Sequence, residues 1–359
     1  MTTPATLDDL NAIQQLDSED VLGAVERFAD QCREGWEIGL AAEGLPDASG
    51  LESVVVLGMG GSGVSGDVLQ AVVEPRLLVP LRTIKSYGPL PDWVGRNSLV
   101  LAVSYSGSTE ETVAGLDEAR ARGCRIVAVS SGGPLAERAP LEGFAHVRIP
   151  PGHQPRASLG YLTMPLLAVL AQVGLVPDMQ EDVDEAVAVL SDIASRCHRK
   201  HGTSDNPAKS LAEELKGRVP VVYGGYGLGA VAAYRFKCDL NEYAKTPAFA
   251  GVLPELDHNE IVGWKGLSEL TSENFINVLL IDPREHPRVA LRFEITRKLI
   301  STALPSFCEV TAEGEGPLAR LLSLILLTQL ASIYLALSYG EDPGPVEVIT
   351  ALKNELASR

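Results

Sequence analysis

VVVLGMGGSG, residues 54–63, is the stretch of sequence that decides the fold. Four consecutive apolar residues (54–57) lead directly into a turn that contains four glycines. A continuous apolar run is typical of a strand that is buried on both faces, as in a parallel sheet covered by helices. The stretch therefore predicts a buried strand, a glycine-rich turn and then a helix from about Ser62 to Val73.

Strand-like and helix-like segments alternate along most of the chain. Further strands are predicted at 81–85, 99–103, 126–129 and 146–149 in the first half, and at 219–223, 275–281 and 307–310 in the second. Helices are predicted at 109–122, from 159 to about 200, at 229–242 and at 288–301. We therefore predict an α/β protein with two similar domains, each a parallel sheet sandwiched by helices.

The segment HGTSDNP (201–207) gathers glycine, serine, asparagine and proline, which is typical of a junction between domains. The predicted domains are residues 1–200, with a helical N-terminal extension, and residues 201–359, with long C-terminal helices. A length of 359 residues suits about two domains of ordinary size.

The chain is strongly acidic, with 47 Asp and Glu against 30 Lys and Arg and a net charge of −17. Such a surface repels phosphodiester backbones, so we do not expect a nucleic acid partner. A small anionic substrate would need local help from backbone N–H groups or from a positioned arginine.

Several features indicate a cytoplasmic protein. The five cysteines are odd in number and form no C-x-x-C pair, which suits reduced thiols. The first twenty residues lack the basic segment and apolar core of an export signal. The apolar stretch 321–338 approaches the length of a membrane span, but serine, threonine and glutamine interrupt it. We interpret it as a buried core or subunit-interface helix, and expect no membrane association.

The glycine turn allows three interpretations. Gly58, Gly60 and Gly63 match the G-x-G-x-x-G spacing of a dinucleotide fold. However, the next predicted strand ends in Lys85-Ser86-Tyr87, and no carboxylate stands there to accept the ribose hydroxyls. A tight turn without any ligand and a loop that faces a different phosphate both remain open at this point.

A second segment favours a phosphate monoester. The predicted strand 99–103 leads into SYSGSTEET (104–112), where hydroxyl groups and a glycine precede the first helical turn. Hydroxyls and free N–H groups at a helix N-terminus form an anion site without net positive charge. Ordinary N-capping by Thr109 is the simpler alternative, but it leaves the gathering of so many hydroxyls unexplained.

GMGGSG followed some forty residues later by SYSGSTEET resembles the sugar isomerase (SIS) domain, a parallel α/β sandwich that binds phosphosugars. The resemblance implies that Ser104, Ser106 and Thr109 hold the phosphate. It also implies that the first loop lines the sugar, through Gly60, Gly61 and Ser62. On this interpretation the glycines make room for a sugar phosphate and not for a nucleotide.

Candidate chemistry lies in the second half, in segments 241–245 and 254–261. Converting an aldose phosphate into a ketose phosphate requires ring opening, proton movement between C1 and C2, and stabilisation of an enediolate oxygen. One carboxylate can carry the proton, an imidazole suits ring opening near neutral pH, and a fixed cation suits the oxyanion.

The sequence resembles the bifunctional phosphoglucose/phosphomannose isomerases, a branch of the SIS isomerases, over nearly the whole chain. Besides the two loops, the resemblance rests on PRASLGY (155–161), LNEYAKTPAFAGVLPELDHNEIVGW (240–264) and DPGPVEVITALK (342–353). It implies that Glu242 is the base and that Arg156 steadies the enediolate. It also implies that His258 opens the ring, usually from the neighbouring subunit, with help from Lys353. A homodimer, a hexose 6-phosphate substrate and no cofactor or metal are expected.

Each assignment has a simpler alternative. Glu242 could merely pair with Lys245, His258 could be a loop histidine, Arg156 could be structural, and Lys353 could be a solvated lysine on a terminal helix. Glu255 is a second candidate for the base. The cluster Cys197-His198-Arg199-Lys200-His201 offers possible metal ligands, but we interpret it as a solvated helix end.

We predict an isomerase of glucose 6-phosphate, and also of mannose 6-phosphate, that forms fructose 6-phosphate through a cis-enediol(ate). Gly344 stands where members of the resembled family often carry a hydroxyl residue that is associated with accepting both C2 epimers. Glycine keeps the space at this position and loses the hydroxyl contact. The alternatives are a non-catalytic phosphosugar-binding SIS regulator and an NAD-linked enzyme. Glu242, Arg156 and His258 favour turnover, and the absence of an acidic ribose clamp disfavours NAD.

Overall fold

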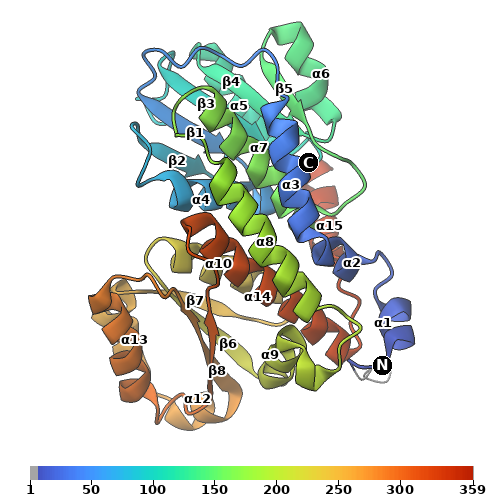
Figure 1. Ribbon diagram of the computed structural model, residues 1–359, viewed down its shortest axis with the longest axis vertical. Helices are drawn as coiled ribbons and strands as arrows, with labels where there is room; N and C mark the ends of the chain where they lie inside the picture. Colours follow the sequence, from blue (N-terminus) through green and yellow to red (C-terminus); the bar gives the residue numbers. More distant parts are fainter. Residues whose placement is uncertain (1–6, 359) are drawn as a thin grey trace. The chain divides into compact units, whose positions relative to one another are not determined.

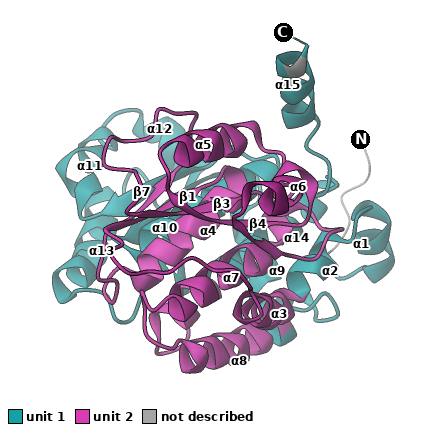
Figure 2. Cartoon of the chain, turned by 90° about the horizontal axis from the view of Figure 1, so that it is seen from above, with its two compact units in different colours: residues 1–26, 195–311, 324–359 teal, residues 27–194, 312–323 magenta. Residues whose placement is uncertain are grey.

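A computed structural model describes residues 7–358 of the chain, which divide into two compact units. Unit 1 comprises residues 1–26, 195–311 and 324–359, and unit 2 comprises residues 27–194 and 312–323 (Figure 2). Each unit contains one parallel sheet with helices packed against it (Figure 1). The predicted α/β class with two sandwiched parallel sheets is therefore confirmed.

The sheet of unit 2 has five parallel strands in the order β2-β1-β3-β4-β5. The strands are β1 (Ser53–Leu57), β2 (Leu81–Ile84), β3 (Ser98–Val103), β4 (Arg125–Ser130) and β5 (Ala145–Arg148). Residues 53–57 and 98–103 are buried throughout, as expected for central strands covered on both faces. Because all strands run the same way, the loops that follow them lie along one edge of the sheet, where ligands of such folds bind.

Helices cover both faces of this sheet. The helices of unit 2 are α3 (Phe28–Leu40), α4 (Gly60–Val73), α5 (Glu110–Ala121), α6 (Gly133–Glu142), α7 (Leu159–Gln172) and α8 (Gln180–Arg196). Val55, Val100 and Ala128 of the sheet share one buried cluster with Leu116 of α5 and Leu135 of α6. On the other face α4 contacts β1, and α7 contacts β4, α3 and α4.

The sheet of unit 1 has four parallel strands in the order β7-β6-β8-β9. They are β6 (Val219–Gly225), β7 (Phe249–Leu253), β8 (Phe275–Ile281) and β9 (Phe307–Thr311). Val221 and Leu279 of the sheet form a buried cluster with Phe293 of α13 (Pro287–Ile300). The helix α10 (Leu228–Glu242) contacts β6, β7 and β8.

The remaining elements of unit 1 are short helices and the C-terminal helices. They are α1 (Leu10–Leu16), α2 (Val21–Glu26), η2 (Thr203–Asp205), α9 (Pro207–Leu215), η3 (Glu255–His258), α11 (Glu260–Gly263), α12 (Ser268–Asn274), α14 (Pro317–Tyr339), whose first turns belong to unit 2, and α15 (Glu347–Ala357). In length and composition α14 could cross a membrane, but its most apolar stretch of 18 residues is 94% buried within the protein. It is a core helix, as the polar interruptions predicted.

Outside the region 159–200, the ends of the predicted strands and helices differ from the observed ends by at most two residues, and several elements were not predicted. The strand β7 was missed because Gly251 interrupts a short segment whose first residues, Phe249 and Ala250, are exposed. The helical region 159–200 is divided between α7 and α8 by residues 173–179. These differences leave the order of strands and glycine-containing turns unchanged.

Candidate active site

The loop that follows β3 is folded around the hydroxyl group of Ser104. This hydroxyl oxygen is fully buried with its side chain and accepts hydrogen bonds from the N–H groups of Gly107 (3.1 Å) and Thr109 (3.3 Å). It also lies 2.8 Å from Oγ1 of Thr109. Thr109 is the N-cap residue of α5, but its side chain makes no capping hydrogen bond. Capping therefore does not account for the Thr109 hydroxyl, which instead faces Ser104.

Ser106 lies at the exposed tip of the same loop. Its Oγ is 3.0 Å from Oγ of Ser108 and accepts a hydrogen bond from the Ser108 N–H at 3.3 Å. The loop can turn here because Gly107 has φ of +73°, and a Cβ at this position would collide with the carbonyl oxygen of Gly132. The chain thus presents several hydroxyls directly before the N-terminus of α5, the end of a helix that favours anions.

The glycine turn after β1 lies beside the loop that contains Arg156. The helix α4 begins at Gly60, and a Cβ on Gly61 would stand 2.9 Å from the carbonyl oxygen of Pro155 and 3.4 Å from Cα of Arg156. Oγ of Ser62 accepts a hydrogen bond from the N–H of Tyr105 at 3.3 Å. The two predicted loops and the arginine therefore lie together in unit 2.

Arg156 belongs to the short helix η1 (Pro155–Ala157) and is 6% exposed. Hydrogen bonds hold the ends of this segment: Nε2 of Gln31 donates to the carbonyl of Ala157 (2.9 Å), and Oγ of Ser158 donates to the carbonyl of Gln154 (2.8 Å). These bonds hold residues 154–158, and the chain places the backbone of the buried Arg156 beside the first turn of α4.

Glu242 is the last residue of α10 and is partly buried. It lines a cavity of about 590 Å³, a size that suits a small ligand. The other lining residues are Asn241, Lys245, Glu341, Asp342, Pro345, Val346, Glu347, Val348 and Ile349. Nζ of Lys245 donates to the backbone carbonyls of Glu242 (2.9 Å) and Asp342 (3.1 Å). This lysine joins the end of α10 to the segment between α14 and α15.

His258 and Lys353 both have exposed side chains. His258 ends η3 after β7, and Lys353 lies in α15. Among the described residues, neither is part of the lining of the cavity that contains Glu242. Within unit 1 the structure therefore presents Glu242, His258 and Lys353 on three different elements. Glu255, the second candidate for the base, is exposed, and its Oε1 accepts a hydrogen bond from Asn259 at 3.1 Å.

The segment with Gly344 is a tight turn. The N–H of Gly344 donates to Oδ1 of Asp342 at 2.8 Å, and Oδ2 of the same carboxylate accepts from the Ser18 hydroxyl at 2.6 Å. A Cβ on Gly344 would meet the ends of the Asp342 and Glu19 side chains at 3.2 Å. Because those ends are flexible, a side chain here needs only their small displacement.

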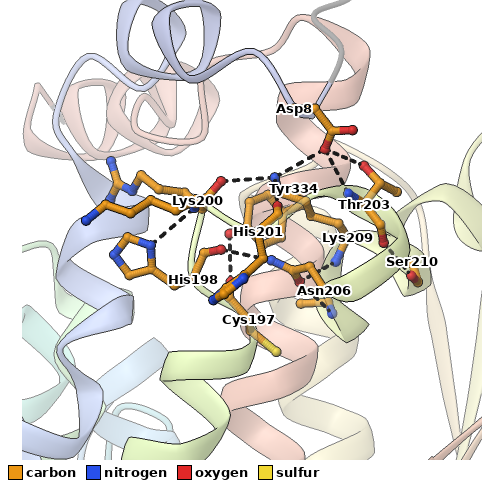
Figure 3. A network of polar contacts seen from close by, with 12 residues as sticks. Asp8, Cys197, His198, Lys200, His201, Thr203, Asn206, Lys209, Ser210 and Tyr334 are labelled. Atoms are coloured by element: carbon orange, nitrogen blue, oxygen red, sulfur yellow. Dashed lines mark hydrogen bonds and ion pairs between the residues drawn. The ribbon is translucent and has the colours of Figure 1, made fainter.

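The polar cluster 197–201 follows the end of α8 and is only partly solvated. Lys200 and His201 are exposed, whereas Cys197 and Arg199 take part in a buried network that the interpretation of the sequence did not include. Cys197 is fully buried, and Nη2 of Arg199 pairs with Glu26 at 2.8 Å. Lys209 is also fully buried, and its Nζ donates to the carbonyls of Arg199 (3.0 Å) and His201 (2.6 Å) (Figure 3). The burial of Lys209 lowers its pKa. This network fixes the segment that precedes α9.

Within residues 7–358 the structure contains no group of three or more His, Cys, Asp or Glu side chains that could hold a metal ion. The prediction from sequence did not include two residues that lie beside the predicted site. Tyr105 stands between Ser104 and Ser106, and Lys245 lines the cavity of Glu242. Tyr105 carried no signal, whereas Lys245 was weighed only as an ion-pair partner of Glu242.

Comparison with known families agrees with this architecture. Residues 51–173 match the SIS domain family, and residues 204–356 match the family described as bacterial phospho-glucose isomerase C-terminal SIS domain. A solved structure of a hypothetical protein from Thermus thermophilus superposes with a TM-score of 0.70 at 18% identity, covering 97% of this chain and 94% of that one. The fold and the loops thus define a protein of two SIS domains.

Relatives with higher identity narrow the family. A bifunctional phosphoglucose/phosphomannose isomerase of Caldicellulosiruptor bescii is 38% identical over 93% of this chain and 98% of its own length. One of Aquifex aeolicus is 37% identical over 94% of this chain and 98% of its own. The chain belongs to the family of bifunctional phosphoglucose/phosphomannose isomerases.

Proposed function

We propose that the protein is an aldose–ketose isomerase that interconverts glucose 6-phosphate, and also mannose 6-phosphate, with fructose 6-phosphate through a cis-enediol(ate). The observation that carries this proposal is the similarity, over essentially their whole length, to relatives that carry both activities in their names. The hydroxyl-lined loop before α5 supports a substrate with a phosphate monoester, since it offers donors at a helix N-terminus.

In this proposal the loop residues hold the phosphate and the glycine turn accommodates the sugar. Ser106 and Thr109 offer their hydroxyls to the phosphate oxygens, and the buried hydroxyl of Ser104 holds the loop that presents them. Gly60, Gly61 and Ser62 line the sugar from the first turn of α4. Arg156, buried directly beside Gly61, supplies a fixed positive charge for the enediolate oxygen. No net positive field is needed, which suits a chain with a net charge of −17.

Glu242 is proposed as the proton carrier. Its carboxylate takes the proton from C2 of the open-chain aldose, and the electron pair forms the enediolate double bond. A proton then shifts from the C2 hydroxyl to O1, and the same carboxylate returns its proton to C1, which gives the ketose. The position of Glu242 on the wall of a cavity supports this role, because a general base must be reachable by substrate. His258 and Lys353 are proposed to open the sugar ring.

We further propose a homodimer in which His258 reaches the site of the neighbouring subunit. The exposure of His258 and Lys353 supports an arrangement in which they act on a partner. The helix α15 projects from the other elements of unit 1 (Figure 2) and exposes the apolar side chains of Val348, Ile349, Leu352 and Leu356. Such a helix face gains by being covered. The reduced cysteines and the buried α14 support a cytoplasmic protein.

The proposal is tested by a coupled assay of fructose 6-phosphate formation from glucose 6-phosphate and from mannose 6-phosphate, run in the presence of a chelator. Turnover of both substrates supports the bifunctional enzyme. Turnover of glucose 6-phosphate alone would restrict its range. Binding of the sugar phosphates without turnover would instead favour a phosphosugar-binding regulator. Loss of activity on chelation would contradict metal-independent chemistry.

A further inference from the structure

Tyr105 stands between Ser104 and Ser106 in the loop proposed to hold the phosphate (residues 104–109, the phosphate loop). Its side chain nevertheless turns into the protein and is 7% exposed. Among the hydrogen bonds described for residues 104–109, those that reach the segment carrying Arg156 are made by the Tyr105 side chain. Its ring therefore leaves the phosphate side of the loop and reaches toward the arginine side.

The phenol of Tyr105 forms hydrogen bonds with the backbone of residues 150–158 (the arginine loop, which carries Arg156) at two points. Its hydroxyl donates to the carbonyl of Pro150 at 2.9 Å, and it accepts a hydrogen bond from the N–H of His153, also at 2.9 Å. These two positions lie three to six residues before Arg156. Burial raises the pKa of the Tyr105 phenol, so the hydroxyl keeps its proton and remains a donor at neutral pH.

The backbone of Tyr105 is fixed by two other loops. Its N–H donates to Oγ of Ser62 in the glycine turn at 3.3 Å. Its carbonyl accepts hydrogen bonds from both the N–H (2.9 Å) and the hydroxyl (2.7 Å) of Ser131, which follows β4. One residue thus joins four loops at the carboxyl edge of the sheet, and its hydroxyl is the part that reaches the arginine loop.

We propose that Tyr105 is a positioning residue that sets the place of Arg156 relative to the phosphate loop through its hydroxyl group. The inference rests on the proposed function, since it assigns a consequence to the location of Arg156. The phosphate fixes one end of the substrate, and the enediolate forms at the other. A tether between the two loops therefore sets whether the guanidinium meets the developing oxyanion, and small misplacements of such groups are costly.

The test is the variant Tyr105→Phe, which removes one oxygen atom and keeps the ring. We expect kcat for glucose 6-phosphate isomerisation to fall about tenfold. KM, and competitive inhibition by inorganic phosphate, should stay within about twofold, because the phosphate-holding hydroxyls are untouched. Unchanged kcat, or weakened phosphate binding that accounts for the whole loss, would overturn the inference.

Tyr334→Phe is the matched control. Its hydroxyl is also buried and donates to a backbone carbonyl, that of Cys197 at 2.8 Å, but it lies among residues of unit 1 outside the site. It should lower stability by an amount similar to Tyr105→Phe and leave kcat unchanged. An equal fall in kcat for both variants would show that the effect is general destabilisation.

A double-mutant cycle separates positioning from an independent role. If Tyr105 acts through Arg156, Tyr105→Phe should change kcat less than about twofold in an Arg156→Gln background. A full tenfold loss in that background would overturn the proposal. Parent activity is measured alongside, so that an inactive parent counts against the proposed function and not against the tether alone.

Amide hydrogen exchange reports on the tether without any need for activity. The His153 N–H donates to the Tyr105 hydroxyl, so its exchange should be at least about tenfold faster in Tyr105→Phe and unchanged in Tyr334→Phe. Equal protection of His153 in parent and Tyr105→Phe would show that the hydroxyl does not hold this loop, whatever the kinetics.

Discussion

Arg235 and Asp239 form an ion pair inside α10, with Nη2–Oδ1 at 2.8 Å and Nε–Oδ2 at 2.9 Å. Their side chains are 2% and 1% exposed. Glu242 follows Asp239 by three residues and therefore lies on the same side of the helix. The arginine cancels a buried negative charge directly before the proposed base. A doubly hydrogen-bonded pair of this kind tolerates the loss of both partners better than the loss of one.

The first prediction concerns the stability of this pair. Arg235→Met should lower the free energy of unfolding by about 3–5 kcal/mol, because it removes the cation that forms two hydrogen bonds with the buried Asp239 carboxylate. Arg235→Met combined with Asp239→Leu should recover at least half of that loss. Denaturant unfolding measures both. The exposed pair Arg33–Asp30 is the control, and Arg33→Met should change stability by less than about 1 kcal/mol. Additive losses in the double variant would contradict the prediction.

The second prediction concerns the proton carrier. Glu242→Gln should lower kcat by roughly two to four orders of magnitude and leave KM largely unchanged, because the amide keeps the shape but cannot accept the C2 proton. Steady-state kinetics with glucose 6-phosphate measures this. Glu255→Gln tests the second candidate, whose exposed carboxylate accepts from Asn259, and should retain the parent rate. The reverse pattern would assign the base to Glu255.

The third prediction concerns the phosphate. Ser106→Ala should raise KM for the sugar phosphate about tenfold with little change in kcat, because a hydroxyl that contacts bound phosphate contributes about equally before and during the reaction. Inhibition by inorganic phosphate should weaken in parallel. Ser191→Ala removes a hydroxyl that bonds only to the Val187 carbonyl of α8 among the described contacts, and should change neither constant. A fall in kcat alone would rule out a phosphate contact.

The fourth prediction concerns the close approach of the glycine turn to the arginine loop. A Cβ on Gly61 would stand 2.9 Å from the backbone oxygen of Pro155, which cannot rotate away. Gly61→Ala should therefore separate the two loops and lower kcat/KM at least about tenfold. Gly95→Ala, where a Cβ meets nothing within 4 Å, should leave activity unchanged. If Gly61→Ala were as active as the parent, the close contact between Gly61 and Pro155 would not be needed for activity.

The fifth prediction concerns pH. Burial and the nearby Arg148 lower the pKa of His146, whose Nε2 lies 2.8 Å from the Ser130 hydroxyl. Because the unfolded chain binds this proton more readily, the stability held at neutral pH is lost as pH falls below about 6.5 and through the folded pKa. His146→Gln should remove this part of the pH dependence.

The comparison of parent and His146→Gln isolates the histidine from other groups. Burial raises the pKa of Asp17 and of Asp67, and these groups act in the opposite sense, since stability rises as pH falls through their raised values. They are common to both proteins and cancel in the difference. Denaturant unfolding at about pH 7.5 and about pH 5.5, on either side of the ordinary histidine pKa, measures it. Identical slopes for the two proteins would refute the prediction.

The sequence predicted those features that depend on local pattern. Buried parallel strands appear as continuous apolar runs, and the serines after β3 stand out because several hydroxyls precede a helix N-terminus, the end that favours anions. What it could not indicate depends on contacts between distant segments. Tyr105 looks like any aromatic residue until its hydroxyl is seen to bond with Pro150 and His153. Lys209 likewise gives no sign of its burial, because its partners Arg199 and His201 offer backbone carbonyls.

The burial of α14 has a consequence for how the cell must make this protein. A helix of 23 residues is about 34 Å long, enough to cross the hydrocarbon layer of a bilayer. Its apolar surface is buried in the folded protein, where Gln329 donates to the Tyr243 hydroxyl and Tyr334 donates to the Cys197 carbonyl, both earlier in the chain. A nascent or truncated polypeptide in which α14 is not yet packed exposes an apolar helix to chaperones and to the membrane insertion machinery. Early packing of α14 therefore protects the newly synthesised enzyme from aggregation and from insertion into a membrane.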